Sequence, residues 1–411
     1  MEILLSAPGV LCCAGNGRTD FFNALLNGDK SGIRPVTTSG GRPFLVGRIR
    51  DEALGPAEAH GSSGPGVYAA GTRIIRIIGA VLEQIRGEVE TAIRNYGPGR
   101  VGVCMGVCDN GSEGSLTAHR AYFDGGAFPA DYDLRFQGAA FPAEFVSRRL
   151  GVSGPVVTVS TACASGAGAV IKGAQLISAG LCDAVIAGGA DVVSETVLLG
   201  FASLEAVSDG VCNPFSKNRK GITLGEGAAF FVMTKSGPGN GEPRVELRGY
   251  GESADAFHMT APRSDGSGAA RAMKEALSRA RLDPGEVDYI NLHGTGTALN
   301  DRMEALALDA VFRKSLPPAS STKPITGHTL GAAGALELAV CWMTLYTAGS
   351  GPKAPVPPGL PPHCWDGVYD GEIPALRFAG PESSGENVKV CMSNSFAFGG
   401  CNTSLILARV N

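Results

Sequence analysis

The stretch "VSTACASGAGA" (159–169) sets one cysteine, Cys163, among alanine, serine and glycine residues. At the first turn of a helix, a cysteine faces unpaired backbone N–H groups and the positive end of the helix dipole, which favour a thiolate and lower the thiol pKa. The same N–H groups can hold an oxyanion that develops during acyl transfer. Small neighbours leave room for a substrate, which favours a nucleophile. Cysteine is also a common small core residue, so this stretch alone leaves a buried structural role as an equal alternative.

Two of the six histidines, His293 in "NLHGTGTALND" and His328 in "KPITGHTLGAAG", lie in turns rich in glycine and threonine. Each turn ends an extended segment, and its glycines allow a substrate to approach the backbone closely. A single histidine is more often a surface or a satisfied core residue. One cysteine and two histidines could also bind zinc, but these three come from distant segments without the paired spacing of zinc ligands. The pattern therefore favours catalysis without a metal.

Three charged residues lie near these histidines in the sequence, namely Lys323, Glu337 and Glu304. Lysine and glutamate are costly to bury alone and tolerable when paired, so these residues could orient the two imidazoles from behind. Solvated surface charges are the alternative.

Two aromatic residues, Phe396 and Phe398, precede a Gly-Gly turn in "SNSFAFGGCN" (393–402). Aromatic side chains beside such a turn suit a mobile gate at the mouth of a cavity. Aromatic residues at a strand end are usually part of the core, so both interpretations remain open.

The elements that must position these residues alternate between short apolar runs and longer amphipathic segments, which predicts an α/β fold. The predicted strands are 101–107, 184–190, 228–234, 289–294 and 388–394, and the predicted helices are 169–180 and 266–282. A polar, glycine-rich and proline-containing stretch at 236–244 predicts a boundary between two halves, 1–240 and 241–411.

A weak internal repeat indicates that the two halves are related. The segment "TACASGA" (161–167) aligns with "TGHTLGA" (326–332) without a gap. The first threonine, the glycine at the sixth position and the final alanine are identical in the two segments. Each segment follows an extended stretch and opens a helix of small residues. The repeat therefore predicts that Cys163 and His328 occupy equivalent helix starts.

Composition narrows the class of protein. The 411 residues are 44% hydrophobic and 18% charged with a formal net charge of −4, which gives no reason to expect nucleic acid or an anionic membrane as partner. Eleven cysteines without a disulfide-framework spacing favour a reducing compartment. The sequence has no run of about 18 apolar residues and no signal-peptide pattern at residues 1–15. We therefore expect a cytoplasmic, soluble protein without a membrane span.

Several enzyme classes lack their characteristic motifs in this sequence. No GxGxxG follows a predicted strand, and neither GxxxxGK[ST] nor GxSxG occurs, which argues against nucleotide binding and a serine hydrolase. A cysteine protease remains formally compatible with one cysteine and one histidine. It explains neither the second turn-borne histidine nor the repeat.

Five ordered motifs now resemble one family. They are "VSTACASG" (159–166), "PFSKNRKGITLGEGAA" (214–229), "HGTGT" (293–297), "KPITGHTLGAAGALE" (323–337) and "SNSFAFGG" (393–400). Together with "GNGRTDFFNALLNGDKSGI" (15–33), they resemble the elongating type of β-ketoacyl-acyl-carrier-protein (ACP) synthases. The resemblance implies a thiolase fold, in which two duplicated α/β halves form a five-layer αβαβα sandwich, usually in a homodimer.

The resemblance also implies roles for these residues and no cofactor. Cys163 would carry the acyl chain as a thioester, and His293 and His328 would stabilise the enolate formed when malonyl-ACP loses CO2. Lys323, Glu337 and Glu304 would organise the histidines. The backbone N–H groups of Cys163 and Phe398 would form the oxyanion hole, and Phe398 would gate the pocket beside Phe396.

Related branches differ at identifiable positions. Degradative thiolases use a second cysteine in a C-terminal Cys-x-Gly motif, initiating synthases use a Cys-His-Asn set, and chain-length factors lack the active cysteine. The segments 121–134, 200–226, 290–308 and 360–367 most resemble the ketosynthases of aryl polyene clusters, although Ser216 and Cys401 depart from the family's usual aspartate and threonine.

We expect acyl-ACP and malonyl-ACP as substrates. The partner subunit would be a second copy or a chain-length-factor-like protein. A non-catalytic partner subunit and a general fatty-acid synthase remain alternatives.

ACP is acidic, so a local basic patch is expected despite the net charge. Lys217, Arg219 and Lys220 form the candidate contact, with a solvated turn as the alternative. The side chains that set the depth of the acyl pocket are expected within 105–150.

Overall fold

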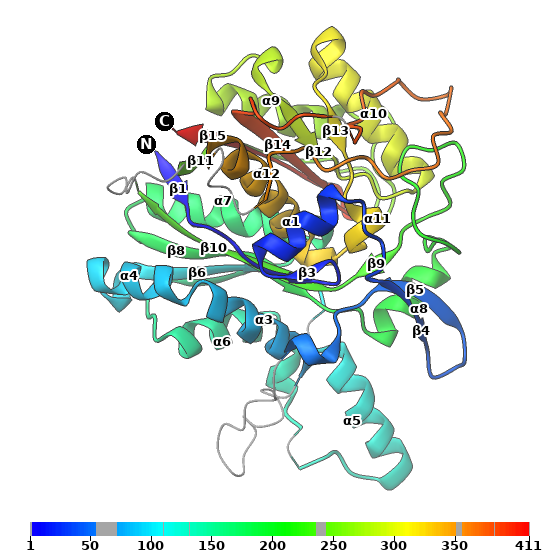
Figure 1. The fold of residues 1–411 in the computed structure, drawn as a ribbon. Coiled ribbons are helices and arrows are strands. Elements are labelled where there is room, and N and C mark those ends of the chain that lie inside the picture. Colours follow the sequence, from blue (N-terminus) through cyan, green and yellow to red (C-terminus); the bar gives the residue numbers. More distant parts are fainter. Residues whose placement is uncertain are drawn as a thin grey trace.

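The computed structural model describes residues 2–54, 72–109, 111–130, 132–235, 244–350, 356–381 and 383–410. These residues form five layers (Figure 1). Two helices, α7 (Ser165–Ser178) and α12 (Ala333–Ser350), lie between two sheets, and further helices cover the outer face of each sheet. The predicted thiolase fold, a five-layer αβαβα sandwich of two duplicated halves, is therefore confirmed.

The duplication is visible in the order and direction of the strands. In each half, three neighbouring strands run parallel to one another. Two further strands continue the sheet, and each of them is antiparallel to the strand before it. In the first half the order is β7 (Val156–Val159), β6 (Val101–Gly106), β8 (Ala184–Asp191), β10 (Gly227–Lys235) and β1 (Ile3–Leu5). In the second half it is β13 (Ala319–Ser320), β12 (Tyr289–Asn291), β14 (Val390–Phe396), β15 (Cys401–Val410) and β11 (Arg244–Ala254).

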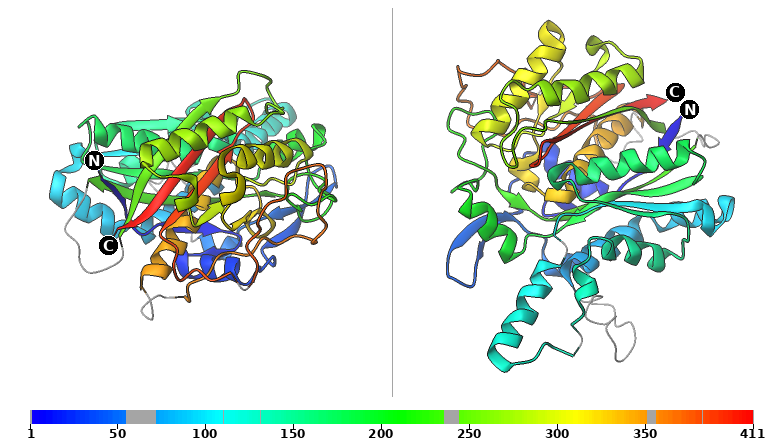
Figure 2. Two further views of the ribbon diagram at one scale, coloured as in Figure 1. Left: turned by 90° about the horizontal axis from the view of Figure 1, so that it is seen from above. Right: turned by 180° about the vertical axis from the view of Figure 1, so that it is seen from behind.

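The two halves meet where β1 pairs with β11, with Leu4 opposite Glu246. The two ends of the chain lie close together at this junction in every view (Figure 1, Figure 2). The predicted boundary at residue 240 falls in 236–243, which lies outside the described residues.

Outer helices cover the sheets because each has one apolar face. In α3 (Arg73–Gln84), buried Ile74, Ile78 and Val81 recur at helical spacing and pack on the first sheet together with α4 (Arg86–Tyr96) and α6 (Phe141–Leu150). Helices α9 (Ser267–Ala280) and α10 (Ala298–Phe312) cover the second sheet in the same way.

The described residues also form smaller elements. They are β2 (Gly9–Cys12), β3 (Gly15–Asn16), α1 (Arg18–Leu26), β4 (Ile33–Thr37), β5 (Pro43–Gly47), α5 (Ser112–Gly125), α8 (Glu195–Ser203), β9 (Leu224–Gly225) and α11 (Lys323–Thr326). Short 3-10 turns precede the two central helices, at η4 (Ala162–Ala164) and η7 (Leu330–Ala332). Helix α5 projects away from the layered body (Figure 1, Figure 2).

Predicted elements agree with the structure in type, and their ends differ by a few residues. The clearest difference is β12, which ends at Asn291, whereas the apolar run predicted a strand to 294. The chain must leave the sheet there because the N–H groups of His293 and Gly294 bind the carboxylate of Glu304 instead of a neighbouring strand.

The central helix α12 is unusually apolar. Together with η7 it forms a stretch, Leu330–Ser350, that is long and apolar enough to cross a membrane, and 94% of this window is buried inside the fold. Its neighbours are α7 and strands of both sheets. It is therefore a buried core helix of this fold.

Candidate active site

Cys163 and His328 both follow a residue in the left-handed backbone region. Ala162 has φ +48° and Gly327 has φ +70°. The predicted equivalence of Cys163 and His328 is nevertheless wrong, because Cys163 is the second residue of η4, whereas the second residue of η7 is Gly331, three residues after His328. A left-handed conformation costs an alanine roughly 1–2 kcal/mol, which marks the Cys163 turn as strained. The two turns differ beyond that point. Cys163 lies within η4, directly before α7, whereas η7 separates the His328 turn from α12.

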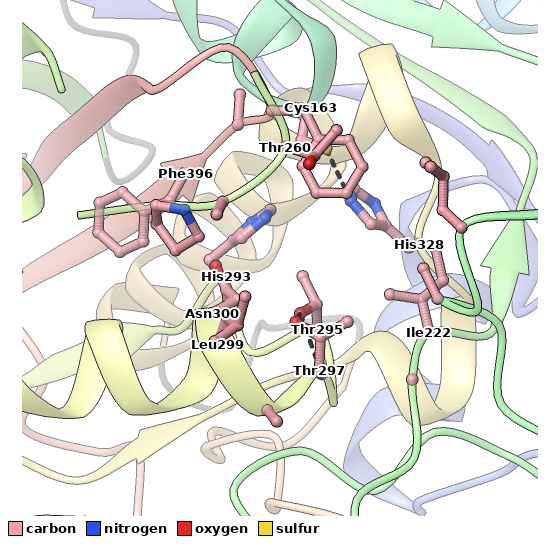
Figure 3. Close-up of a pocket in the computed structure, with 18 of the residues that line it drawn as sticks. Cys163, Ile222, Thr260, His293, Thr295, Thr297, Leu299, Asn300, His328 and Phe396 are labelled. Atoms are coloured by element: carbon pink, nitrogen blue, oxygen red, sulfur yellow. Dashed lines mark hydrogen bonds between the residues drawn. The ribbon is translucent and has the colours of Figure 1, made fainter. Parts of the chain in front are cut away.

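The cysteine and both histidines meet at one point inside the molecule (Figure 3). The Sγ atom of Cys163 lies 3.0 Å from Nε2 of His328. The nearest ligand atoms of Cys163, His293 and His328 all lie within 4.8 Å of one another. The two imidazole rings are nearly perpendicular, with centroids 5.3 Å apart. All three residues are buried.

Each histidine presents an Nε2–H group to this point. Nδ1 of His328 accepts a hydrogen bond from the backbone N–H of Leu330 (3.3 Å), so the proton of the neutral ring resides on Nε2. Nδ1 of His293 faces the ammonium of Lys323 (3.4 Å), which can only donate. Burial lowers the pKa of both histidines well below the usual range, and the Lys323 charge adds to this effect. The site therefore offers two neutral hydrogen-bond donors.

The same hydrogen bonds bear on metal binding. A histidine that ligates a metal through Nε2 usually donates its Nδ1–H to a carboxylate or carbonyl. Here the Nδ1 atoms of His293 and His328 face donors, so both Nε2 atoms carry protons instead of free lone pairs. The donor arrangement is unsuited to zinc.

Lys323 lies behind His293 and is almost fully buried. Its ammonium contacts the backbone carbonyl and Nδ1 of His293 and forms an ion pair with Glu337 on α12. Burial raises the pKa of Glu337 to about 7, and the Lys323 charge opposes this rise.

Glu304 supports the same histidine differently from the sequence expectation. Its carboxylate on α10 accepts hydrogen bonds from the backbone N–H groups of His293 (2.8 Å) and Gly294 (2.7 Å). It therefore holds the backbone of the turn rather than the imidazole ring. Burial raises the pKa of Glu304 to about 8, and those two N–H groups lower it.

The expected lowering of the Cys163 thiol pKa is wrong. Burial raises the pKa of Cys163 to about 11, and this effect outweighs the nearby donors. The Lys323 charge and the backbone N–H groups of Phe398 and Cys163 act in the opposite direction. Desolvation dominates because the helix start lies inside the protein rather than at its surface. The two N–H groups that the resemblance implies as an oxyanion hole are nevertheless among the groups that lower this pKa.

A cavity of about 420 Å³ leads from the surface to these three residues (Figure 3). Phe396 is buried at the end of β14, beside His293. Phe398 is 36% exposed in the turn between β14 and β15 and stacks on Phe201 of α8. Phe398 is thus at the cavity wall with one face open to solvent, and Phe396 is part of the inner wall.

Most of the cavity wall could not be predicted from the sequence. Among the residues that the structure describes, the wall includes Ile222, Thr260, Thr295, Thr297 and Leu299, and no part of it comes from 105–150. Thr295 and Thr297 belong to the "HGTGT" motif, and their hydroxyls lie 3.0 Å apart. That motif was the available signal, and Ile222 likewise lies in the motif at 214–229, whereas nothing in the sequence brings Thr260 to this point.

The three basic candidates differ in their surroundings. Arg219 forms an ion pair with Asp370 at 2.6 Å, and only 9% of its side chain is exposed. Lys217 and Lys220 are exposed, and Lys220 lies at the rim of the cavity. The accessible basic charge therefore belongs to the two lysines.

The fold and this site define an acyltransferase of the condensing type, with a buried thiol facing two neutral donors. The family model "Beta-ketoacyl synthase, N-terminal domain" matches residues 79–237, and the model of the C-terminal domain matches residues 244–355. The 3-oxoacyl-[acyl-carrier-protein] synthase 2 of Coxiella burnetii is 31% identical over all of this chain and 99% of its own length. The chain belongs to the β-ketoacyl synthase family.

Solved structures agree with this assignment. A chain of the ketosynthase ApeO in complex with its chain length factor ApeC, from Xenorhabdus doucetiae, is 37% identical with a TM-score of 0.87, covering 100% of this chain and 98% of that one. A chain of the ishigamide ketosynthase/chain length factor is 27% identical with a TM-score of 0.84, covering 100% and 99%.

Proposed function

We propose that this protein is the catalytic ketosynthase of an aryl polyene or related polyene pathway, and that it condenses malonyl-ACP with an acyl group carried on Cys163. The observation that carries the proposal is the meeting of the Cys163 thiol with the Nε2–H groups of His293 and His328 inside one cavity. The similarity to the ApeO–ApeC complex supports the polyene branch.

In the first step, the sulfur of Cys163 attacks the thioester carbonyl of acyl-ACP. The negative charge that develops on the carbonyl oxygen is held by the backbone N–H groups of Cys163 and Phe398. The carbon–sulfur bond to ACP then breaks, and the ACP thiol leaves with the proton of the Cys163 thiol. Because burial raises the pKa of Cys163, the thiolate depends on these donors and on Nε2–H of His328.

In the second step, malonyl-ACP loses CO2. The electron pair of the broken carbon–carbon bond becomes an enolate, whose oxygen accepts hydrogen bonds from the Nε2–H groups of His293 and His328. Neutral donors stabilise the enolate without protonating its carbon prematurely. The enolate carbon attacks the Cys163 thioester, the carbon–sulfur bond breaks, and the released thiolate takes up one proton. The products are 3-oxoacyl-ACP, CO2 and the free thiol.

Substrates and partners follow from the same proposal. Acyl-ACP and malonyl-ACP would approach the cavity mouth, where exposed Lys220 supplies positive charge, and exposed Lys217 lies three residues earlier in the chain. The subunit partner would be a second copy or, as in the ApeO–ApeC complex, a chain-length-factor-like protein. The protein would work in the cytoplasm, which fits eleven free cysteines. The chain would divide into halves at residues 1–240 and 241–411.

Two alternatives make different predictions. A non-catalytic partner subunit does not need a nucleophile, whereas this chain combines Cys163 with both histidine donors and the Lys323–Glu337 pair. A general fatty-acid synthase would prefer saturated acyl chains over conjugated ones.

The test uses the purified protein, alone and with a chain-length-factor-like partner. It is supplied with malonyl-ACP and either an aryl-primed polyenoyl-ACP or a saturated acyl-ACP of equal length. We expect CO2 release and 3-oxoacyl-ACP formation, faster with the conjugated chain. Faster elongation of the saturated chain would favour the fatty-acid alternative. Absence of condensation with either chain would support the non-catalytic subunit.

A further inference from the structure

Asp191, at the end of β8, is fully buried, and its carboxylate collects four backbone N–H groups from three separate segments. Oδ2 accepts from Gly331 (2.7 Å) and Cys108 (3.0 Å). Oδ1 accepts from Asp109 (2.9 Å) and from Val192 (3.2 Å). One carboxylate thus ties the loop after β6 in the first half to the η7 turn in the second half.

The first of these ties leads to the histidine. Gly331 directly follows Leu330, whose N–H group binds Nδ1 of His328 and so keeps the proton on Nε2. Residue 331 cannot carry a side chain, because an added Cβ would lie 2.8 Å from Oδ2 of Asp191 and 2.9 Å from the Cys108 nitrogen. The position of the His328 turn is therefore set by contact with Asp191.

The second tie leads to the cysteine. Asp191 holds the backbone of Cys108, and the Cys108 thiol donates to the carbonyl oxygen of Ala162 at 3.1 Å. Ala162 is the strained residue with φ +48° directly before Cys163. The same carbonyl accepts a hydrogen bond from the hydroxyl of Ser165 (2.6 Å). Asp191 thus supports the turn of the nucleophile as well.

We propose that Asp191 is a positioning residue of the active site, which holds the Cys163 turn and the His328 turn at the spacing that brings Nε2–H onto the thiol. It touches neither the sulfur nor the imidazole and acts through Leu330, Gly331 and Cys108. The inference deepens the proposed function and rests on it, because it concerns the same nucleophile. Buried carboxylates that accept several N–H groups often serve stability alone, so the test must separate the two roles.

The main variant is Asp191→Asn, which keeps the size of the side chain but turns one acceptor into an NH2 group facing backbone donors. Glu246→Gln on β11 neutralises another buried carboxylate away from the site. Ile77→Ala on α3 removes buried side-chain atoms between α3 and the first sheet, which lowers the free energy of unfolding without touching either turn. The measurements are the thermal midpoint, the rate of Cys163 alkylation by iodoacetamide followed by peptide mass spectrometry, and kcat and KM with malonyl-ACP.

A positioning role predicts that Asp191→Asn slows alkylation of Cys163 and lowers kcat, each by about 10- to 100-fold, with KM for malonyl-ACP within about twofold of wild type. Both control variants keep the wild-type alkylation rate well below their thermal midpoints. Equal alkylation and kcat in Asp191→Asn and wild type would overturn the proposal. So would an equal loss in Ile77→Ala at a matched thermal midpoint.

A second variant covers the case in which Asp191→Asn does not fold. Gly331→Ala pushes the His328 turn away from the same carboxylate and predicts the same loss of alkylation. If neither variant folds, the carboxylate serves folding and the positioning role is rejected. Alkylation needs no ACP substrate, so its outcome is separate from that of the proposed function, which fails only if the wild-type protein does not condense.

Discussion

The imidazoles of His293 and His328 act as donors because of what lies behind them. Their residue types and their turns could be predicted from the sequence. The protonation pattern could not, since it depends on the Leu330 N–H group and the Lys323 ammonium, which approach Nδ1 only in the folded chain. The same holds for the thiol of Cys163, whose pKa is governed by burial rather than by the helix start.

The Lys323–Glu337 pair is buried, so its two charges depend on each other. Lys323→Met leaves the Glu337 carboxylate without its cation and is expected to cost about 3–5 kcal/mol in the free energy of unfolding. In Lys323→Met/Glu337→Met, most of this stability returns because no charge remains unpaired. Decarboxylation of malonyl-ACP stays low in both variants, because Nδ1 of His293 has lost the ammonium. Urea unfolding and CO2 release measure the two effects. Recovery of CO2 release in the double variant would show that Lys323 does not position His293.

His363 is a third buried histidine, and it ties two site-forming loops together. Its Nε2–H donates to the carbonyl of Pro214 (3.1 Å), and its Nδ1 accepts from the N–H of Ser321 (3.2 Å), two residues before Lys323. Burial lowers the pKa of His363 to about 4. Between about pH 6.5 and 4 the unfolded chain binds a proton at this residue that the folded chain does not, so this contribution to stability is lost as the pH falls.

The pH dependence can be tested with His363→Phe, which keeps an aromatic ring against Phe378. Wild type should lose up to about 1.4 kcal/mol more per pH unit below pH 6.5 than the variant, because one titrating group is absent. Urea unfolding at pH 7, 6 and 5 gives the two slopes. Parallel slopes would mean that His363 takes up its proton over the same pH range in the folded and the unfolded chain, so that folding does not lower its pKa.

Two left-handed turns carry Cys163 and His328 into the site. The sequence repeat predicted that these turns correspond, because small residues recur in register. It did not predict that Ala162 would have a positive φ, since alanine rarely does, nor that its counterpart at the start of η7 is Leu330 (φ +52°). Strain of this kind arises from the surrounding contacts, here the hydrogen bonds of Cys108 and Ser165 to the Ala162 carbonyl.

The turns should therefore respond oppositely to similar changes. Ala162→Gly relieves strain and is expected to keep kcat within about threefold of wild type. Gly327→Ala adds a Cβ that would lie 2.6 Å from the Leu224 carbonyl oxygen at φ +70°, so the His328 turn must shift and kcat should fall about 10- to 100-fold. Steady-state kinetics with malonyl-ACP compare the pair. Equal activity of Gly327→Ala and wild type would contradict the turn geometry described above.

The strands and central helices were more predictable than the cavity. Strands such as β8 are buried along their whole length and read as apolar runs, and α7 has the small residues that close packing on α12 requires. The cavity wall, in contrast, combines Ile222 and Thr260 from two separate loops with Leu299 from the start of α10. No local sequence pattern predicts that these three residues meet, because their proximity follows from the topology of both halves.

At the surface of the molecule, Lys220 at the rim of the cavity and Lys217 in the same loop are exposed, whereas Arg219 is already paired with Asp370. Lys217→Glu/Lys220→Glu should raise KM for malonyl-ACP severalfold and leave kcat near wild type, since exposed charges steer an acidic partner without touching the chemistry. The difference should shrink at high salt. Steady-state kinetics at two ionic strengths test this, with Lys274→Glu on α9, also exposed, as the control. An unchanged KM would remove these lysines from the ACP surface.

The central claim is that Cys163 accepts the acyl chain and passes it to the enolate of malonyl-ACP. Intact-protein mass spectrometry tests this most directly, on wild type and Cys163→Ala incubated with acyl-ACP and then with malonyl-ACP. We predict that wild type gains the mass of one acyl group on the peptide containing Cys163 and loses it as 3-oxoacyl-ACP appears. Cys163→Ala should gain no mass and still release CO2 slowly, because both histidine donors remain. An acyl adduct that persists in Cys163→Ala, or condensation at the wild-type rate in that variant, would contradict the claim.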